Sequence, residues 1–293
     1  MSIAYLIDCR SLGLPRFEHD VNHSSLKSFP PQAPIFQKDV YAHTGCVNSV
    51  EYSMDENYLL SGGDDRRVLM WSIADLLKDE APSPLQIMNT MHLSNIFAVK
   101  FSNDGRLAFS GSNDMTMFAH VVETGQKMFT NHIMGAVHNI DSSPISDYEI
   151  SICRSSSHNV AFIDLRDYRE PLDVLKVPGM SCAYSGQYNP GNAALYAVAG
   201  EQRGLVIYDR RFMNKAYLDL GYTGANADSM FGRWSNDGNA IVNLVPHSYP
   251  VYIDLLNNRR VRLKDSKYTN HHTIKSVSFL DDKTVVTGGD GFE

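Results

Sequence analysis

The chain has 293 residues, of which 26 are basic and 33 acidic, giving a formal net charge of −7. This charge argues against a general nucleic-acid binder, because such binding depends on neutralising phosphates. Hydrophobic residues make up 43% of the chain and charged residues 20%, which excludes a disordered or collagen-like chain and indicates a globular core. The longest uncharged stretch, 177–200, is rich in Gly, Pro, Asn and Ser, so we expect no membrane-spanning segment.

The cysteines and the N-terminus indicate the compartment. The four cysteines are scattered with no C-x-x-C pair: Cys9, Cys46, Cys153 and Cys182. That pattern is typical of reduced thiols in an intracellular protein. The apolar run 3–7 lacks a basic flank and is too short for a signal peptide. We therefore expect a protein of the nucleus, the cytoplasm or both.

Taken in chain order, the first segment precedes any repeat. Residues 28–31 read Ser-Phe-Pro-Pro, which breaks any helix, so 1–34 is predicted to be an N-terminal extension and linker. The first clear unit follows at 43–71. Three strand-like runs, 47–52, 58–61 and 68–71, are separated by turn-forming residues.

A second unit starts at His92, and weaker copies follow in phase. First strands are predicted to end at Tyr52, Phe101, Ser142, Tyr188, Trp234 and Phe279. Third strands are predicted to end at Trp71, His120, Ile163, Tyr208 and Ile253. Both series repeat about every 45 residues, which is the period of a β-propeller blade. The predicted fold class is therefore all-β, and helical repeats are disfavoured because no long 3.6-residue period competes.

The first two units resemble the WD40 repeat residue by residue. That repeat has a His before the first strand, a Ser or Thr ending the second, an Asp in the next turn and a Trp in the third. The matching residues are His43, Ser61, Asp65 and Trp71, then His92, Ser110, Asp114 and His120. Buried polar groups of these types must pair with one another. These tetrads are therefore predicted to be structural, and the second to be weaker because His120 replaces Trp.

Counting the units gives five blades and part of a sixth. Residues 35–293 are thus expected to form an incomplete WD40 β-propeller of about five and a half blades out of seven. The run 35–41 occupies the place of the strand that closes such a ring. We expect the propeller to be truncated and not closed, with exposed sheet edges.

The sequence carries no recognisable catalytic or cofactor motif. It has no phosphate loop, no H-E-x-x-H helix and no G-x-S-x-G elbow. The pair His271-His272 falls where a blade begins, so we interpret it as a loop or structural feature and not as a metal site. The basic run 259–264 suits the outer strand of a blade, and nucleic-acid contact there is disfavoured. We predict no cofactor, no metal and no enzymatic activity.

Two consecutive blades end their third strand with an Asp-x-Arg box. The boxes are Asp164 with Arg166, and Asp209 with Arg211. One interpretation is a strand end whose Asp caps the following turn while the Arg is solvated. The other is an interface, because such turns of neighbouring blades lie on one face and Arg is enriched at binding hot spots.

Paired boxes of this kind resemble those of the substrate receptors of cullin-4 ubiquitin ligases, which dock on the adaptor damaged-DNA-binding protein 1. Residues 43–71 and the run HLSNIFAVKFS from His92 are similar to the cullin-4-associated factor 5 group. The resemblance covers about 35–289 and is strongest through Gly111. It departs at Ile163 and Tyr208, which occupy the slot of the usual Trp.

The resemblance implies a non-enzymatic β-propeller receptor that holds the adaptor through Asp164, Arg166, Asp209 and Arg211 and a protein substrate on its opposite face. Substrate-face candidates are Thr44, Asp64, Arg66, Arg67, Ser94 and Asn95. Two alternatives stay open: a general WD-repeat scaffold that binds peptides or histone tails without any link to ubiquitin, and a cryptic hydrolase.

Overall fold

A computed structural model of the chain describes residues 39–78, 81–88, 90–221, 228–266, 268–271, 275–280 and 284–290. The chain divides into two compact units, Met1–Tyr41 and Ala42–Glu293. The predicted extension 1–34, and residues 35–38 of the predicted closing strand, lie outside the described residues. The boundary placed after residue 34 remains a prediction.

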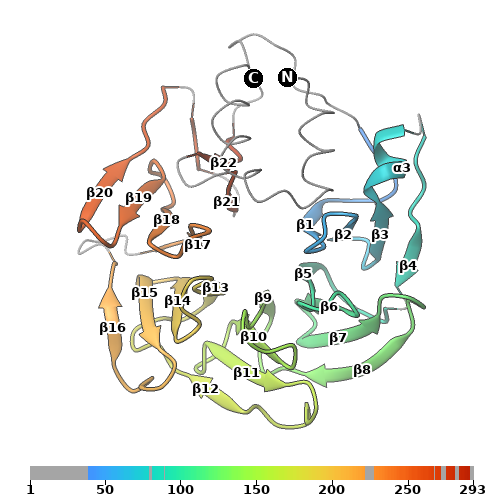
Figure 1. The fold of residues 1–293 in the computed structure, drawn as a ribbon, viewed down its shortest axis with the longest axis horizontal. Coiled ribbons are helices and arrows are strands. Elements are labelled where there is room, and N and C mark those ends of the chain that lie inside the picture. The colour runs from blue at the N-terminus through green and yellow to red at the C-terminus, as the bar shows by residue number, and fades with distance from the viewer. Residues whose placement is uncertain are drawn as a thin grey trace. The chain divides into compact units, whose positions relative to one another are not determined.

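The second unit contains five four-stranded antiparallel sheets, which we number as blades in chain order (Figure 1). Blade one contains β1 (Val47–Tyr52), β2 (Tyr58–Gly63), β3 (Val68–Ser72) and β4 (Gln86–Met88). Blade two contains β5 (Ile96–Phe101), β6 (Leu107–Ser112), β7 (Thr116–Val121) and β8 (Lys127–His132). Blade three contains β9 (Val137–Ser142), β10 (Glu149–Arg154), β11 (Val160–Asp164) and β12 (Asp173–Leu175).

Blade four contains β13 (Ala183–Tyr188), β14 (Leu195–Gly200), β15 (Gly204–Asp209) and β16 (Ala216–Asp219). Blade five contains β17 (Phe231–Trp234), β18 (Ala240–Leu244), β19 (Val251–Asp254) and β20 (Arg259–Arg262). A sixth, two-stranded sheet pairs β21 (Val277–Phe279) with β22 (Val285–Thr287). The predicted all-β propeller architecture is confirmed, with no sheet closed on itself among the described strands.

The predicted strand ends agree closely with the observed strands. All six predicted first-strand ends are the last residues of β1, β5, β9, β13, β17 and β21. The basic run at 259–262 forms β20, an outer strand, as expected. One helix was not predicted: α3 (Ile73–Lys78), where the Ser72 Oγ accepts a hydrogen bond from the N–H of Asp75 at 3.3 Å as an N-cap. No helix within the described ranges has the length and apolar character needed to cross a membrane.

Antiparallel pairing decides on which side of the sheets each turn lies. Because consecutive strands run in opposite directions, the turns after the first and third strands of every blade share one side, which we call the exit face. The turns after the second strands, and the loops that lead into the next blade, share the other side, which we call the entry face. The two predicted Asp-x-Arg boxes begin at the last residues of β11 and β15, Asp164 and Asp209, and therefore lie on the exit face.

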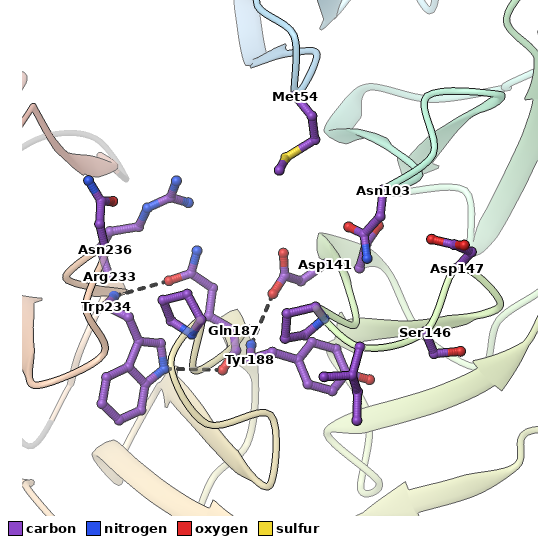
Figure 2. Close-up of a pocket in the computed structure, with 14 residues that line it drawn as sticks. Met54, Asn103, Asp141, Ser146, Asp147, Gln187, Tyr188, Arg233, Trp234 and Asn236 are labelled. Carbon is purple, nitrogen blue, oxygen red and sulfur yellow. Dashed lines mark hydrogen bonds between the residues drawn. The ribbon is translucent and has the colours of Figure 1, made fainter. Parts of the chain in front are cut away.

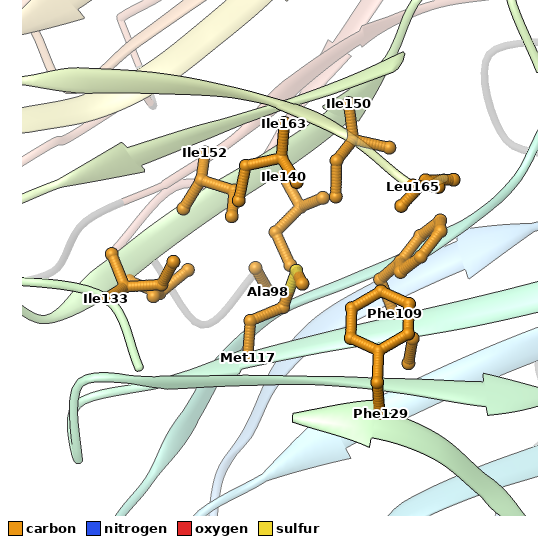
Figure 3. Close-up of a cluster of buried hydrophobic side chains, with 12 residues drawn as sticks. Ala98, Phe109, Met117, Phe129, Ile133, Ile140, Ile150, Ile152, Ile163 and Leu165 are labelled. Atoms are coloured by element: carbon orange, nitrogen blue, oxygen red, sulfur yellow. The ribbon is translucent and has the colours of Figure 1, made fainter. Parts of the chain in front are cut away.

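The core lies in the seams between neighbouring blades. One cluster joins blades two and three through Phe109, Met117, Ile150 and Ile163 (Figure 3). The next residue back on β11, Phe162, belongs instead to the cluster that joins blades three and four. Successive side chains of a strand point to opposite sides of its sheet. A strand such as β11 therefore contributes side chains to the seams on both sides of its blade, and the blades stack face to face.

Close packing across a seam explains one glycine of the repeat. Gly62 lies on β2, and a Cβ placed there would come within 2.8 Å of Ile96 Cγ2 and Val99 Cγ1 on β5. Both of these side chains are buried. Only glycine fits this approach without displacing the next blade.

Candidate functional site

The first predicted tetrad is a continuous chain of hydrogen bonds. His43 Nδ1 lies 2.9 Å from Asp65 Oδ1, and His43 Nε2 lies 2.8 Å from Ser61 Oγ. The Trp71 indole N–H donates to the same Ser61 oxygen at 2.9 Å. These contacts require a proton on His43 Nδ1, so that the Ser61 hydroxyl donates to Nε2. The network ties the entry-face turn of blade one to its third strand.

The charge of Asp65 is held by this network. Burial favours the neutral acid, but hydrogen bonds from His43, Arg67 and the Thr44 N–H outweigh it and lower the pKa of Asp65 to about 2. Asp65 therefore stays ionised at neutral pH, where it anchors His43. This is the chemistry of a turn anchor, which agrees with the structural interpretation of the tetrad.

The second tetrad has the same layout with a substituted fourth member. His92 Nε2 lies 2.9 Å from Ser110 Oγ, and His92 Nδ1 lies 3.2 Å from Asp114 Oδ2 and 3.0 Å from Thr116 Oγ1. His120 stands in the Trp slot, fully buried. Burial lowers the pKa of His92 although the Asp114 carboxylate opposes this, which favours a neutral ring. That this network is weaker than the first remains a prediction.

Each Asp-x-Arg box closes on itself as a bidentate ion pair. Arg166 donates through Nε and Nη2 to the two oxygens of Asp164 at 2.9 and 2.6 Å. Arg211 does the same to Asp209 at 2.9 and 2.6 Å. In each box the Arg backbone N–H also donates to the Asp. The Asp thus caps its turn and also aims the guanidinium.

The arginines of these two turns remain available to a partner. Their side chains are 67% and 68% exposed, for Arg166 and Arg211 respectively. Hydrogen bonds from the arginines lower the pKa of Asp164 and of Asp209 to about 2, so both pairs stay charged down to acidic pH. The Arg166 guanidinium also lies 5.0 Å from the centroid of the Tyr148 ring. Each turn therefore presents a preorganised, solvent-facing guanidinium.

A partly buried ion pair between Glu149 and Arg210, which we call the joint, spans the seam and connects the two turns. Glu149 on β10 is the cross-strand partner of Asp164, and Arg210 is the middle residue of the second box. Arg210 Nη2 donates to Glu149 Oε1 at 2.7 Å, and its guanidinium carbon lies 3.4 Å from the centroid of the Phe162 ring. The Tyr188 hydroxyl donates to the same Glu149 oxygen at 2.7 Å. The first turn, the joint and the second turn therefore form one connected strip on the exit face.

A third pair on the exit face has similar chemistry without the joint. Arg106 Nε donates to Asp104 Oδ2 at 2.5 Å in the turn that follows β5, and the Arg106 side chain is 72% exposed. This pair follows a first strand and lies in blade two. It offers a natural control for the two boxes, because Arg106 is similarly exposed and also pairs with an Asp two residues before it, although only Nε of its side chain donates.

The substrate-face candidates all lie on the entry face, in blades one and two. Thr44 and Arg66 are exposed, and Arg66 has a left-handed φ of 66°. Asp64 accepts a hydrogen bond from the Asn48 side chain at 2.8 Å.

The remaining candidates are engaged locally. Arg67 is committed to the tetrad through its 2.7 Å ion pair with Asp65. Ser94 and Asn95 are half-buried and accept hydrogen bonds through their backbone carbonyls. Thr44 and Arg66 are thus better placed than Arg67 to meet a partner, and a substrate role for any of the six remains a prediction.

Sequence reasoning missed a cavity of about 460 Å³ at the centre of the exit face (Figure 2). Its walls come from the ends of the inner strands and the turns that follow them. They include Asp141, Gln187, Tyr188, Arg233 and Trp234. A signal was present in the sequence, because Asp141, Gln187 and Arg233 each stand one residue before a predicted first-strand end.

The described residues offer no cluster of three or more His, Cys, Asp or Glu side chains that could hold a metal ion. The rings of His271 and His247 are tilted by 31° with centroids 5.3 Å apart and an Nδ1–Nδ1 distance of 3.0 Å, while His272 lies outside the described residues. This is a two-histidine loop contact. The prediction that this chain uses no cofactor or metal stays a prediction.

Comparison with known proteins agrees with this architecture. The WD40 repeat family (WD domain, G-beta repeat) matches residues 35–72 and 83–118. The β-propeller domain of Cps50 (Swd1) from Myceliophteria thermophila superposes with a TM-score of 0.60 at 13% identity, covering 74% of this chain and 68% of that chain. The chain therefore contains WD40 repeats and has the fold of a WD40 β-propeller.

The sequence similarity extends further than the repeats alone. The chain is 30% identical over 264 residues to human "DDB1- and CUL4-associated factor 5", which covers 88% of this chain and 28% of that protein. It is 26% identical over 202 residues to WD repeat protein iqw1 of Schizosaccharomyces pombe, covering 62% of this chain and 24% of that one. The chain thus spans about a quarter of the length of these curated relatives and is similar to the cullin-4-associated factor 5 group, as its sequence predicts.

Proposed function

We propose that this chain is the substrate-receptor subunit of a cullin-4 ubiquitin ligase. In this proposal it docks on the adaptor damaged-DNA-binding protein 1 (DDB1) through its exit face. The observation that carries the proposal is the connected strip formed by the two Asp-x-Arg turns and the Glu149–Arg210 joint. The name of its human relative, a DDB1- and CUL4-associated factor, supports the choice of partner.

The chemistry of the strip suits protein recognition. A guanidinium held by its own Asp loses little conformational freedom on binding, and its outward N–H groups remain free to donate to backbone carbonyls or carboxylates. Arg166 and Arg211 are both presented in this way. Ile163 and Tyr208, in the place of the usual Trp, are buried at 0% and 2% exposure. Both side chains lie beneath the turns. The presence of Ile and Tyr in place of Trp therefore leaves the exposed surface of the strip unchanged.

The proposed division of labour assigns the entry face to a protein substrate, with Thr44 and Arg66 the most accessible of the candidate residues. The chain itself performs no catalysis. Its contribution is to hold the substrate near the recruited ligase, which raises the effective concentration of the reacting groups. Such a protein acts inside the cell, in the nucleus or the cytoplasm.

A second candidate function is a WD-repeat scaffold that binds peptides or histone tails with no link to ubiquitin. The central cavity favours this candidate, because it is large enough for side chains of a peptide. The two functions make different demands on the exit face: the receptor needs Arg166 and Arg211, whereas a peptide scaffold needs the cavity.

Co-precipitation from cells separates the two functions. Tagged chain is expected to bring down DDB1, and an Arg166→Ala/Arg211→Ala double variant is expected to lose most of it. An Arg106→Ala variant, which removes an equally exposed arginine from the same face, is the matched control and should retain binding. Failure of this chain to bring down DDB1 would exclude the receptor function and favour the scaffold.

A further inference from the structure

The first strand of each of the five four-stranded blades, which we call its inner strand, carries a polar side chain at one equivalent position. Together these side chains form a ring. The position lies one residue before the last residue of each inner strand, and it is occupied by Glu51, Lys100, Asp141, Gln187 and Arg233. Charged members of this ring alternate in sign around the blades. The ring leads into the central cavity, whose lining includes Asp141, Gln187 and Arg233.

Three members of the ring form ion pairs with one another, with the Lys100 cation between the carboxylates of Glu51 and Asp141. The Lys100 Nζ lies 2.5 Å from Glu51 Oε1 and 3.4 Å from Asp141 Oδ1. Burial lowers the pKa of Lys100, but the two carboxylates outweigh burial and raise it above its usual value. The second oxygen of Asp141 accepts the backbone N–H of Tyr188 at 2.9 Å. The acidic side of the ring is therefore already supplied with donors.

Arg233 is in a different position. Among the residues that the structure describes, it has neither a hydrogen bond nor an ion pair, and the charge of Asp141 acts on it only at longer range. Its guanidinium points into the cavity in Figure 2. Beside it, Gln187 Oε1 accepts the backbone N–H of Trp234 at 3.2 Å. This contact turns the Gln187 amide NH₂ toward the same space. Two unused donors, one of them charged, thus converge on the cavity.

The rest of the wall determines what kind of ligand fits. Apolar side chains also line the cavity, among them Met54, Pro144, Ile145 and Pro190, and Asn236 adds a neutral amide. The carboxylates of Asp141 and Asp147 also line the cavity. A single guanidinium beside these two carboxylates can pair with a monoanion and disfavours a doubly charged phosphate. The apolar rim suits neighbouring side chains of a peptide.

We propose that the central cavity binds a carboxylate of a peptide segment, with the Arg233 guanidinium and the Gln187 amide as its donors. The carboxylate can belong to an Asp or Glu side chain or to a free C-terminus, since both accept a bidentate guanidinium. The site adjoins the Asp-x-Arg strip at Tyr188, which lines the cavity and donates to Glu149. Its two donors, Arg233 and Gln187, take no part in the strip, so the proposal does not depend on DDB1 binding.

Selection from a phage-displayed library of random peptides, some with free C-termini, tests this proposal on the whole chain. Enriched peptides are then synthesised in their acid form and with each carboxylate converted to an amide, and their affinities are measured by fluorescence anisotropy. We expect one carboxylate per peptide to matter, with at least a tenfold loss of affinity for its amide form. If affinity falls when a Glu is changed to Gln or an Asp to Asn, the bound carboxylate belongs to that side chain. If affinity falls on C-terminal amidation, the bound carboxylate is the C-terminus.

Variants of the chain complete the test. Arg233→Gln should reduce affinity for the acid peptides at least tenfold and leave the amide peptides unaffected, while Arg233→Lys should retain part of the binding. Arg262→Gln, which removes an exposed arginine from β20 of the same blade, is the charge-matched control and should bind normally. No enrichment, or equal affinity for acid and amide peptides with the unmodified chain, would overturn the proposal whether or not the Arg233 variants fold. Loss of DDB1 binding in the Arg166→Ala/Arg211→Ala variant leaves this result unchanged, so the two proposals fail separately.

Discussion

Substitution of Arg210 by Ala removes the joint between blades three and four. The Arg210 side chain is 14% exposed and its partner Glu149 is 24% exposed. The change deletes a charged hydrogen bond of 2.7 Å to Glu149 and a contact with the Phe162 ring at 3.4 Å. It also leaves the half-buried Glu149 carboxylate with fewer donors. A charge-assisted hydrogen bond contributes about 1.5–3 kcal/mol, and a desolvated cation–π contact about 1–2 kcal/mol.

Because these contributions overlap and Tyr188 still donates to Glu149, we expect Arg210→Ala to cost about 2–4 kcal/mol of folding free energy. The assay is urea unfolding at pH 7.5, followed by intrinsic fluorescence. Arg211→Ala is the matched control: this neighbouring arginine is 68% exposed, so its loss should leave the unfolding midpoint unchanged. A double-mutant cycle with Glu149→Ala should return a coupling energy of about 1–3 kcal/mol. An Arg210→Ala variant as stable as the unmodified chain would refute this account of the joint.

Three further predictions follow from packing and burial. Gly62→Ala should destabilise the unit by about 1–3 kcal/mol because the new Cβ meets β5 at 2.8 Å. Gly288→Ala, with no atom within 4 Å of its Cβ, is the control, and equal thermal unfolding of the two variants would contradict the prediction. In a Cys9→Ser background, a thiol reagent should label exposed Cys46 quickly and the remaining thiols only on unfolding, because both are buried and burial raises their pKa values to about 12. More than one fast-reacting thiol would be inconsistent with this. Burial lowers the pKa of His138, so the unfolded state binds the proton more tightly and stability should fall as pH drops below about 6.5. The urea unfolding midpoints at pH 7.5 and pH 5.5 should differ less for the His138→Phe variant than for the unmodified chain. The same difference in both proteins would contradict this prediction.

The repeat period made most of the fold predictable. A residue pattern that recurs at blade intervals reports the local strand–turn–strand unit, and the first two units also repeat the same His, Ser and Asp positions. His43, Ser61, Asp65 and Trp71 could be joined in advance because they match the WD40 repeat, in which buried polar groups of these types have to find partners. The helix α3 was missed because six residues are too few to show a helical period.

The functional residues were only partly predictable. The Asp-x-Arg boxes are local and could be seen in the chain, but the joint between them depends on Glu149 meeting Arg210 across a seam, a contact between residues 61 positions apart. The polar ring has a sequence signal, one residue before each first-strand end, yet its members differ chemically from blade to blade. Which of them pair and which face the cavity is decided by geometry between blades, and this cannot be seen from any single repeat.

Direct binding of purified DDB1 to this chain tests the central claim most directly. Calorimetry or biolayer interferometry should detect a complex with the unmodified chain, weakened at least tenfold by Arg166→Ala/Arg211→Ala and less than twofold by Arg106→Ala. Thermal unfolding of all three proteins should coincide, because the substituted arginines are all exposed. The same affinity for the double variant and the unmodified chain, or the same loss with Arg106→Ala, would contradict the assignment of the Asp-x-Arg strip as the adaptor-binding site.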